Sequence, residues 1–406
     1  MDGQRSSKVI WTVKYAVLNI AYFVAFCTVH AYAAVYLLDC GFTNTQVGVL
    51  LAVANILSAV IQPVIAGIID RQGWLTNRRF ILISVATIMA GSALLMVVGK
   101  NRAVVFIIYV IIYMIQFAYQ PVMTALCFEY QKSGCDIWYG LARGLGSAGF
   151  AVTAAIIGGA VEKNGVFILP VVNVAAMAVS LGVLLLFRKP VGVNGSSIEQ
   201  SAGNGATKEV KAHNKISSFV RTYPAFAVFL IATVCFFFAH NMINDFMIQI
   251  IRNLGGGEKE LGYANFLQAI LELPVMAGIG VILKKISAKN LLLVSGTAFF
   301  VKILILYFAV NMAGLFVSQS VQLFAYAVFI PAAAYYVSST MEEFDQVKGQ
   351  AFITSAITIG GVFSNLTSGA ILDHFGVHTM LLGGCIVCLA GVLTAFAAMT
   401  KLPHHV

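Results

Sequence analysis

The sequence predicts an all-α membrane protein with twelve transmembrane helices in two pseudo-symmetric bundles of six. Of its 406 residues, 60% are hydrophobic and only 10% are charged, whereas soluble globular domains carry about 25% charged residues. Its apolar runs last twenty residues or more, the length that a helix needs to cross the hydrocarbon core. A third observation is that the second half repeats features of the first. These properties exclude a soluble enzyme, a disordered chain, a coiled coil and an outer-membrane barrel, whose strands alternate in polarity.

Twelve apolar segments follow one another along the chain. They cover residues 11–38, 44–69, 79–98, 103–128, 137–162, 165–187, 219–251, 258–283, 289–309, 313–340, 347–372 and 376–400. The segment 188–218 is rich in Gly, Ser, Asn and Lys, a composition typical of flexible polar linkers. It divides the chain into an N-terminal bundle, 1–187, and a C-terminal bundle, 219–406.

The two halves are related by an offset of 211 residues. The sequence GGAVEKNG at 158–165 ends the fifth segment, and GAILDHFG at 369–376 ends the eleventh. The same offset relates Pro63 to Pro274 in the second and eighth segments. Six plus six spans in a parallel repeat is the plan of many secondary transporters.

Loop charges predict the orientation. With the N-terminus in the cytoplasm, 17 Lys and Arg residues fall on the cytoplasmic side, 5 fall outside and 3 lie within spans. Cytoplasmic loops of membrane proteins carry such an excess, which also explains the net charge of +9. We therefore expect a multi-pass protein of the cell membrane with both termini and the linker in the cytoplasm.

Ionisable side chains inside the spans are candidates for ion coupling, because each costs roughly 2.5–3.5 kcal/mol at mid-membrane. Glu272 lies midway along the eighth span, and Lys302 is in the ninth. Burial favours the neutral acid, whereas a nearby lysine favours the carboxylate, so a cycle that alternates the two would bind and release a proton. Asp245, nearer the outer end of the seventh span, is the main alternative carrier.

Polar residues at helical spacing predict a central cavity for a solute. The seventh span carries His240, Asn241 and Asn244, and Tyr22 and Gln322 lie in the first and tenth spans. The alternative for each is a helix–helix contact without a ligand. Glu129 and Arg143 flank the loop between the fourth and fifth spans, where we expect them to pair with each other or with a solute.

The loop after the second span resembles the loop motif of the major facilitator superfamily. Matching positions are Asp70, Arg71, Gly73, Arg78 and Arg79. The resemblance implies a gating role, in which the aspartate and the arginines join two bundles in one state. The loop departs from the motif because Ala66 occupies the usual place of the first glycine, and because WLTN separates Gly73 from the arginines.

Within the superfamily the chain is most similar to the lactose-permease branch of proton–sugar symporters. Arg143 matches the sugar-binding arginine of that branch, Glu272 its glutamate in the eighth span, and Lys302 an arginine in the ninth. The resemblance implies that Phe150 replaces the tryptophan that stacks on the sugar.

The same alignment shows departures that leave galactoside specificity unsupported. Gln322 replaces a histidine, Ala325 the proton-carrying glutamate and Ala125 a sugar-binding glutamate, while Asn241 and Asn244 stand where the permease has aspartates. The permease's proton route therefore does not transfer intact.

The sequence has no ATP-binding, metalloprotease or hydrolase motif. We expect a monomeric, non-enzymatic symporter without metal or cofactor, driven by the proton gradient and surrounded by membrane lipid. Its expected substrate is a sugar or oligosaccharide, with no role for nucleic acid. Alternatives are uptake of nucleosides or aromatic acids, proton-coupled drug efflux, and a membrane sensor that transports nothing.

Overall fold

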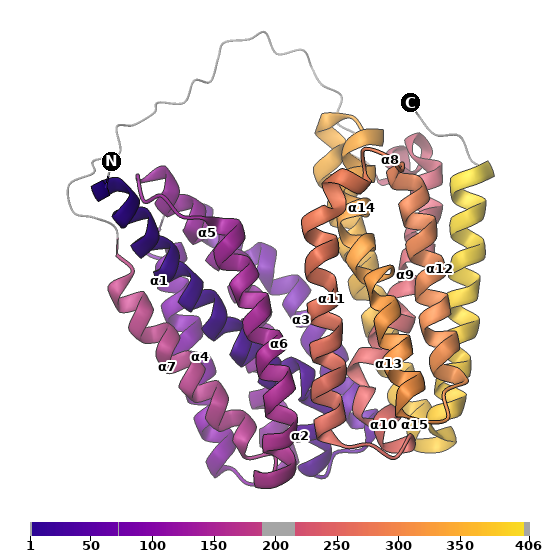
Figure 1. Ribbon diagram of the computed structural model, residues 1–406, viewed down its shortest axis with the longest axis horizontal. Helices are drawn as coiled ribbons and strands as arrows, with labels where there is room; N and C mark the ends of the chain where they lie inside the picture. The colour runs from indigo at the N-terminus through magenta and orange to yellow at the C-terminus, as the bar shows by residue number, and fades with distance from the viewer. Residues whose placement is uncertain (1, 72, 189–215, 402–406) are drawn as a thin grey trace.

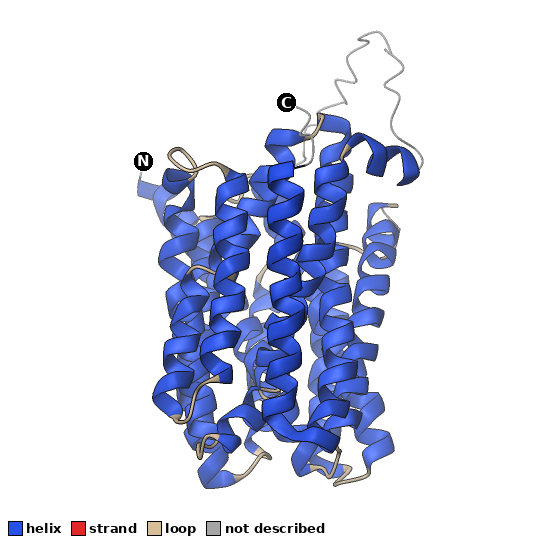
Figure 2. Ribbon diagram, turned by 90° about the vertical axis from the view of Figure 1, so that its right-hand side faces the viewer, coloured by secondary structure: helices blue, strands red, loops and turns tan. Residues whose placement is uncertain are grey.

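The computed structural model describes residues 2–71, 73–188 and 216–401, and these residues form helices and loops without a strand (Figure 2). The N-terminal half contains a π-helical turn, Cys27–Ala31, within its first span. Its α-helices are α1 Asp2–Phe26, α2 Ala33–Asp39, α3 Asn44–Asp70, α4 Asn77–Val97, α5 Arg102–Lys132, α6 Tyr139–Asn164 and α7 Ile168–Leu186.

The C-terminal half contains a 3₁₀ turn, Val321–Leu323, within its fourth span. Its α-helices are α8 Ile216–Thr222, α9 Pro224–Asp245, α10 Met247–Asn253, α11 Glu258–Ile282, α12 Ala288–Tyr307, α13 Met312–Ser320, α14 Tyr326–Thr340 and α15 Glu343–Lys401. At Gly376, φ is 77°, which divides α15 into the predicted eleventh and twelfth spans.

The predicted all-helical membrane fold is confirmed. Ten helical segments of the described chain are long and apolar enough to cross a membrane, and one of these, α15, contains two predicted spans. The 25-residue α11 supplies the eighth predicted span. The first, seventh and tenth spans are each broken into shorter helices, which the sequence did not predict. Residues 189–215 of the predicted linker lie outside the described residues, and its last three residues begin α8.

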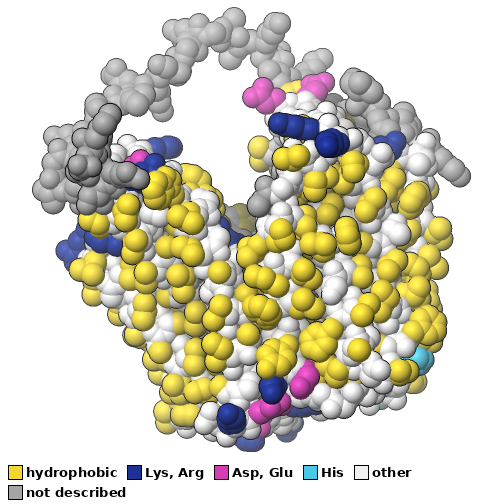
Figure 3. Space-filling model, in the orientation of Figure 1, with side chains coloured by type: hydrophobic (Ala, Val, Ile, Leu, Met, Phe, Trp, Pro, Cys, Tyr) yellow, Lys and Arg dark blue, Asp and Glu magenta, His cyan; other side chains and the backbone are white. Residues whose placement is uncertain are grey.

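The helices form two bundles that stand side by side (Figure 1). Helices α1–α7 make one bundle and α8–α15 the other, and both Asp2 and Lys401 lie at the same end, here named the terminal end. The bundles meet at the opposite end, here named the far end, and diverge toward the terminal end. The space-filling view shows the surface hollowed between the bundles at the terminal end (Figure 3).

The outer surface of both bundles is suited to lipid. Hydrophobic side chains cover the flanks, whereas Lys, Arg, Asp and Glu gather at the two ends (Figure 3). Large apolar residues such as Ile156 and Ile231 are 66% and 58% exposed in the middle of helices. A water-facing helix would not expose such a continuous apolar surface, so these faces belong against acyl chains.

The orientation can be tested by thiol labelling of intact cells. We expect a membrane-impermeant maleimide to label a cysteine at Lys163 of the far end and not one at Lys285 of the terminal end, because the charge asymmetry predicts a cytoplasmic terminal end. Six of the seven native cysteines are buried, which keeps background labelling low. Permeabilised cells, in which both positions should react, are the control. Labelling of Lys285→Cys in intact cells would contradict the orientation.

Candidate functional site

Three polar side chains of the C-terminal bundle form a hydrogen-bonded chain, in which Gln322 and Lys302 are buried and Glu272 is partly buried. The Gln322 side chain donates from Nε2 to Glu272 Oε1 at 3.0 Å, and its Oε1 accepts from Lys302 Nζ at 2.7 Å. Lys302 has no exposed surface. The structure therefore brings together the predicted pair Glu272 and Lys302, but an amide that can serve both partners at once bridges them.

The break in the tenth span positions this bridging amide. The 3₁₀ turn Val321–Leu323 separates α13 from α14, and Gln322 lies within it. The hydroxyl of Ser295 in α12 donates to the carbonyl oxygen of Ala325 at 2.7 Å, and this oxygen also accepts from the backbone nitrogen of Phe329 at 3.0 Å, so a neighbouring helix anchors the start of α14. Irregular backbone at membrane depth needs such partners. The segment thus turns Gln322 inward, toward Lys302 on the adjacent helix.

A second group of polar residues extends from α9. His240 bonds to the Asn244 side chain at 2.9 Å, and Gln268 Nε2 donates to Asn244 Oδ1 at 3.2 Å. Gln268 also donates to Gln319, and His240 stacks on the ring of Tyr326 with centroids 5.0 Å apart. Sequence reasoning missed Gln268, although it lies four residues before Glu272 on the same face of α11.

Asn241 does not join this group. Its side-chain amide donates to the carbonyl oxygen of Phe237 at 2.8 Å and packs closely against Gly361 of α15. Asn241 therefore makes a helix–helix contact, which was the alternative to ligand binding for each polar residue of the spans.

The N-terminal bundle contributes Arg143 and a set of aromatic rings. Arg143 Nη1 donates to Ser147 Oγ at 2.9 Å, and the guanidinium lies 4.4 Å from the ring centroid of Phe23. Phe150 lies near Phe26, with centroids 6.4 Å apart. Among the described residues, Ser147 is the one hydrogen-bond acceptor found for the guanidinium, which leaves most of its donors available for a solute, and the aromatic face of Phe23 supports it.

Tyr22 of α1 is buried within the N-terminal bundle. Its hydroxyl donates to the carbonyl oxygen of Gln116 at 2.9 Å, and the residue has no exposed surface. The structure therefore gives it a packing role that supports the first span.

Glu129 and Arg143 do not form the pair that the sequence predicted. Glu129 Oε2 accepts from Asn77 Nδ2 at 2.9 Å, near the terminal end of α5. Arg143 instead contacts Ser147 and Phe23, a full turn inside α6. The expectation was wrong for this conformation, because a short loop between two helices does not fix which faces the side chains project from.

Asp245 lies apart from the Glu272 chain. It is the last residue of α9, at the break before α10, and it lies near Asn365 of α15 and Tyr113 of α5. It is therefore close to the junction of the two bundles. No hydrogen bond found among the described residues joins it to Glu272, Gln322 or Lys302.

The loop with the superfamily-like motif lies at the terminal end. Arg78 donates from Nε to the Phe187 carbonyl oxygen at 3.1 Å and from Nη2 to that of Leu184 at 2.7 Å. Arg79 donates to the carbonyl oxygen of Trp74 at 2.6 Å. Arg78 thus caps the C-terminal end of α7 within its own bundle, a favourable place for a cation.

The same loop makes no bridge between bundles in this conformation. Asp70, Arg71 and Gly73 are exposed, and no hydrogen bond or ion pair found in the described part of the chain joins them to the C-terminal bundle. The bundles diverge at this end, so the predicted gating contact has no partner within reach (Figure 1).

Two carboxylates join the bundles at the far end. Asp373 of α15 accepts from the backbone nitrogens of Asn44 and Thr45 at 3.1 and 2.7 Å, and from their side chains at 2.8 and 2.6 Å. Glu162 of α6 accepts from the backbone nitrogen of Lys259 at 3.0 Å. Each carboxylate therefore caps the N-terminus of a helix in the other bundle, α3 or α11, where negative charge is favoured.

Glycines allow the helices to approach at the same places. An added Cβ at Gly369 would collide with the Asn44 carbonyl oxygen, and one at Gly48 with that of Asn365. At the other contact, Gly158 meets the Glu258 carbonyl oxygen and Gly262 meets that of Ala154. The α6 residues at 154, 158 and 162 lie 211 positions before their α15 counterparts. The repeat seen in the sequence is therefore a repeated contact, which we name the far-end gate.

Among the described residues, no group of three or more His, Cys, Asp or Glu is arranged to hold a metal ion. The pattern of the MFS_1 like family matches residues 13–382. The chain belongs to this family.

Three solved structures share the fold of this MFS_1 like protein. A mutant of the nucleoside transporter NupG matches with a TM-score of 0.79 and 14% identity, over 96% of this chain and 100% of that one. An autoinhibited POT family peptide transporter matches with a TM-score of 0.73 and 10% identity, over 98% of both chains. A bacterial homologue of the human lysosomal transporter Spinster, inward-facing and unoccupied, matches with a TM-score of 0.68 and 11% identity, over 97% of both chains. No curated protein matches the sequence.

These likenesses confirm the major facilitator fold that the sequence predicted. At such low identity they establish the architecture of the MFS_1 like chain and leave its substrate open.

Proposed function

We propose that this protein is a proton-coupled symporter that takes up a small polar organic solute by alternating access, with sugars or oligosaccharides as the first substrate class. The observation that carries the proposal is the chain Glu272–Gln322–Lys302. It combines a carboxyl group that can change charge with an amide able to exchange its partners for the hydroxyl groups of a solute. Tyr326 is within electrostatic range of Glu272 in its own bundle and of Arg143 in the other bundle, which supports a site between the two bundles.

The coupling follows from the chemistry of the chain. When Glu272 is ionised, Gln322 donates to it and Lys302 offsets its charge through the amide. When Glu272 is protonated, it becomes a donor, and the bridge loses its charged acceptor. A solute hydroxyl can then take the place of one partner. Proton binding and solute binding would in this way favour each other.

Nucleoside uptake is the second candidate. The stacked rings of His240 and Tyr326, with Phe150 on the opposite bundle, offer flat apolar faces of the kind on which a nucleobase stacks. One structural neighbour is a nucleoside transporter, which supports including nucleosides in any search.

Proteoliposomes with an imposed pH gradient test the proposal. A panel of radiolabelled sugars, nucleosides and aromatic acids should show inward accumulation of at least one class, and solutes that raise the thermal midpoint identify the class to test first. Gradient-driven movement in the opposite direction would indicate antiport of the kind used for drug efflux. Ligand binding without flux for any solute would indicate a sensor. Either result would overturn the proposal of symport.

Arg143→Lys is expected to lower kcat/KM for uptake about 100-fold while keeping the positive charge. A planar guanidinium can hold two hydroxyl oxygens at once, whereas an ammonium acts as a point charge, and a lost charged hydrogen bond costs about 1.5–3 kcal/mol. Concentration-dependent initial rates give the measurement. Arg102→Lys, which changes the same residue type at an exposed position of the far end, is the control and should transport normally. Near-normal uptake by Arg143→Lys would show that a point charge suffices.

A further inference from the structure

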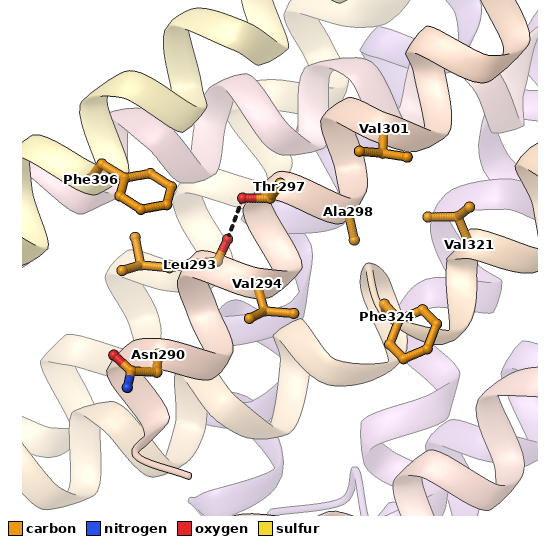
Figure 4. A pocket seen from close by; sticks show the side chains of 9 residues that line it. All are labelled: Asn290, Leu293, Val294, Thr297, Ala298, Val301, Val321, Phe324 and Phe396. Carbon is orange, nitrogen blue, oxygen red and sulfur yellow. Dashed lines mark hydrogen bonds between the residues drawn. The ribbon is translucent and has the colours of Figure 1, made fainter.

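A groove on the membrane-facing side of the C-terminal bundle has no role in the proposed transport site. Its volume is about 680 Å³. One wall is a face of α12, the second is the break in the tenth span, and the third is Phe396 of α15 (Figure 4). Val294, Phe324 and Phe396 are 50%, 55% and 43% exposed there. These large apolar side chains face outward, where the fold meets lipid.

The lining of the groove is suited to a hydrocarbon chain. Leu293, Val294, Val301 and Phe324 are apolar, and the hydroxyl of Thr297 is already bonded to the Leu293 carbonyl oxygen at 2.9 Å. From Asn290 to Val301 the groove follows roughly 16 Å of α12, at about 1.5 Å per residue. The groove is therefore elongated and lined by few polar groups that need a hydrogen-bond partner from a ligand, unlike the polar centre of the bundle.

Positive charge lies at one end of the groove. Asn290 marks that end, in the first turn of α12. The loop before this helix carries Lys284 and Lys285, and Lys289 is the second residue of the helix. Lys284 and Lys285 are exposed, and none of the three lysines forms a salt bridge with a described residue. This is the terminal end of the fold, at the depth of lipid headgroups. Lysines so placed attract anionic lipid.

We propose that the groove is a binding site for one anionic phospholipid, with an acyl chain along α12 and the phosphate at Lys284, Lys285 and Lys289. A neutral lipid would match the apolar lining but not the lysines, and a soluble anion would match the lysines but not the lining. The groove also borders Val321, the first residue of the turn that presents Gln322, and Phe324, the residue that follows this turn. A bound chain would therefore support the broken span from outside.

Native mass spectrometry of the purified protein tests the site with phosphatidylglycerol and phosphatidylcholine of equal chain length. We expect the wild type to retain one phosphatidylglycerol at least fivefold more tightly than phosphatidylcholine. Val294→Trp should fill the groove and weaken phosphatidylglycerol binding at least fivefold. Ile231→Trp, at a similarly exposed position of α9, is the matched control and should bind as the wild type does.

A triple variant with Lys284→Gln, Lys285→Gln and Lys289→Gln tests the contribution of the lipid headgroup separately from that of the acyl chain. It should abolish the preference for phosphatidylglycerol. If Val294→Trp fails to fold, Phe396→Ala removes one wall and should weaken binding in the same direction. Unchanged phosphatidylglycerol binding in a folded Val294→Trp variant would overturn the proposal. Equal binding of the two lipids by the wild type, or a dimer that covers this face, would overturn it as well.

Discussion

A Glu272→Gln variant is expected to lose accumulation of solute against its gradient while keeping solute binding and exchange. Glutamine has the size of the protonated acid and can still pair with the Gln322 amide, which Glu272 contacts at 3.0 Å. Glutamine cannot release a proton, so the steps of the cycle that require an ionised carboxylate at this position cannot occur. Each unit of pH gradient supplies about 1.4 kcal/mol, a factor of about ten in concentration, for each coupled proton.

Proteoliposomes with a gradient of one pH unit provide the measurement. The wild type should concentrate its solute about tenfold with one coupled proton, whereas Glu272→Gln should only equilibrate it. Counterflow, which needs no net proton movement, should persist in the variant and shows that it is folded. Asp245→Asn is the matched control, because Asp245 is also a membrane acid but lies outside the hydrogen-bonded chain. Uphill accumulation by Glu272→Gln would end the proposal and make Asp245 the carrier to examine.

The sequence was sufficient to predict the fold because lipid imposes a simple requirement. A span must be apolar over about twenty residues, and that property can be read without knowing any contact. The breaks were not visible in the same way. The segments around Phe246 and Phe324 carry polar residues such as Asp245 and Gln322, but polar residues within a span indicate a face that meets protein or solute as readily as an interruption of the helix. At the interruption near Phe324, Ser295 of another helix donates to the Ala325 carbonyl oxygen, a contact that no local sequence pattern reveals.

The sequence singled out polar residues that the structure brings together, but it did not predict how they are paired. Glu272, Lys302 and Gln322 were recognisable because polar groups inside spans are costly, yet the bridge through Gln322 depends on the break in its helix. The expected pair of Glu129 and Arg143 failed because adjacency along the chain says little about side-chain direction.

The repeat that forms the far-end gate was recognised in the sequence as a sign of internal symmetry, but not as a contact between the bundles. The sequence repeat GGAVEKNG and GAILDHFG contains both Glu162 and Asp373. Sequence alone gave no indication that each carboxylate reaches a helix of the other half, since their partners Lys259 and Asn44 lie outside the repeated segments.

Replacing both Glu162 and Asp373 by alanine is expected to open the far end and close the terminal end. Each carboxylate caps a helix of the opposite bundle, and losing a capping side chain costs about 0.5–2 kcal/mol. These contacts exist only when the far end is closed, so their loss destabilises this conformation relative to one in which the bundles separate there. A loss of about 1.4 kcal/mol at each contact would shift the ratio of the two conformations about tenfold per carboxylate.

Pulsed EPR distances between spin labels measure this shift. Labels at Arg102 and Val310, one on each bundle at the far end, should move apart in the double variant, while labels at Trp74 and Lys285 at the terminal end should approach. The matched control is Asp39→Ala, which removes a far-end carboxylate that pairs with Lys100 of its own bundle at 3.1 Å. It should leave both distances unchanged, because a contact within one bundle exists in either conformation. If the double variant keeps the wild-type distances, the carboxylates do not hold the far end closed, and the close helix contacts at Gly158 and Gly369 must maintain closure without them.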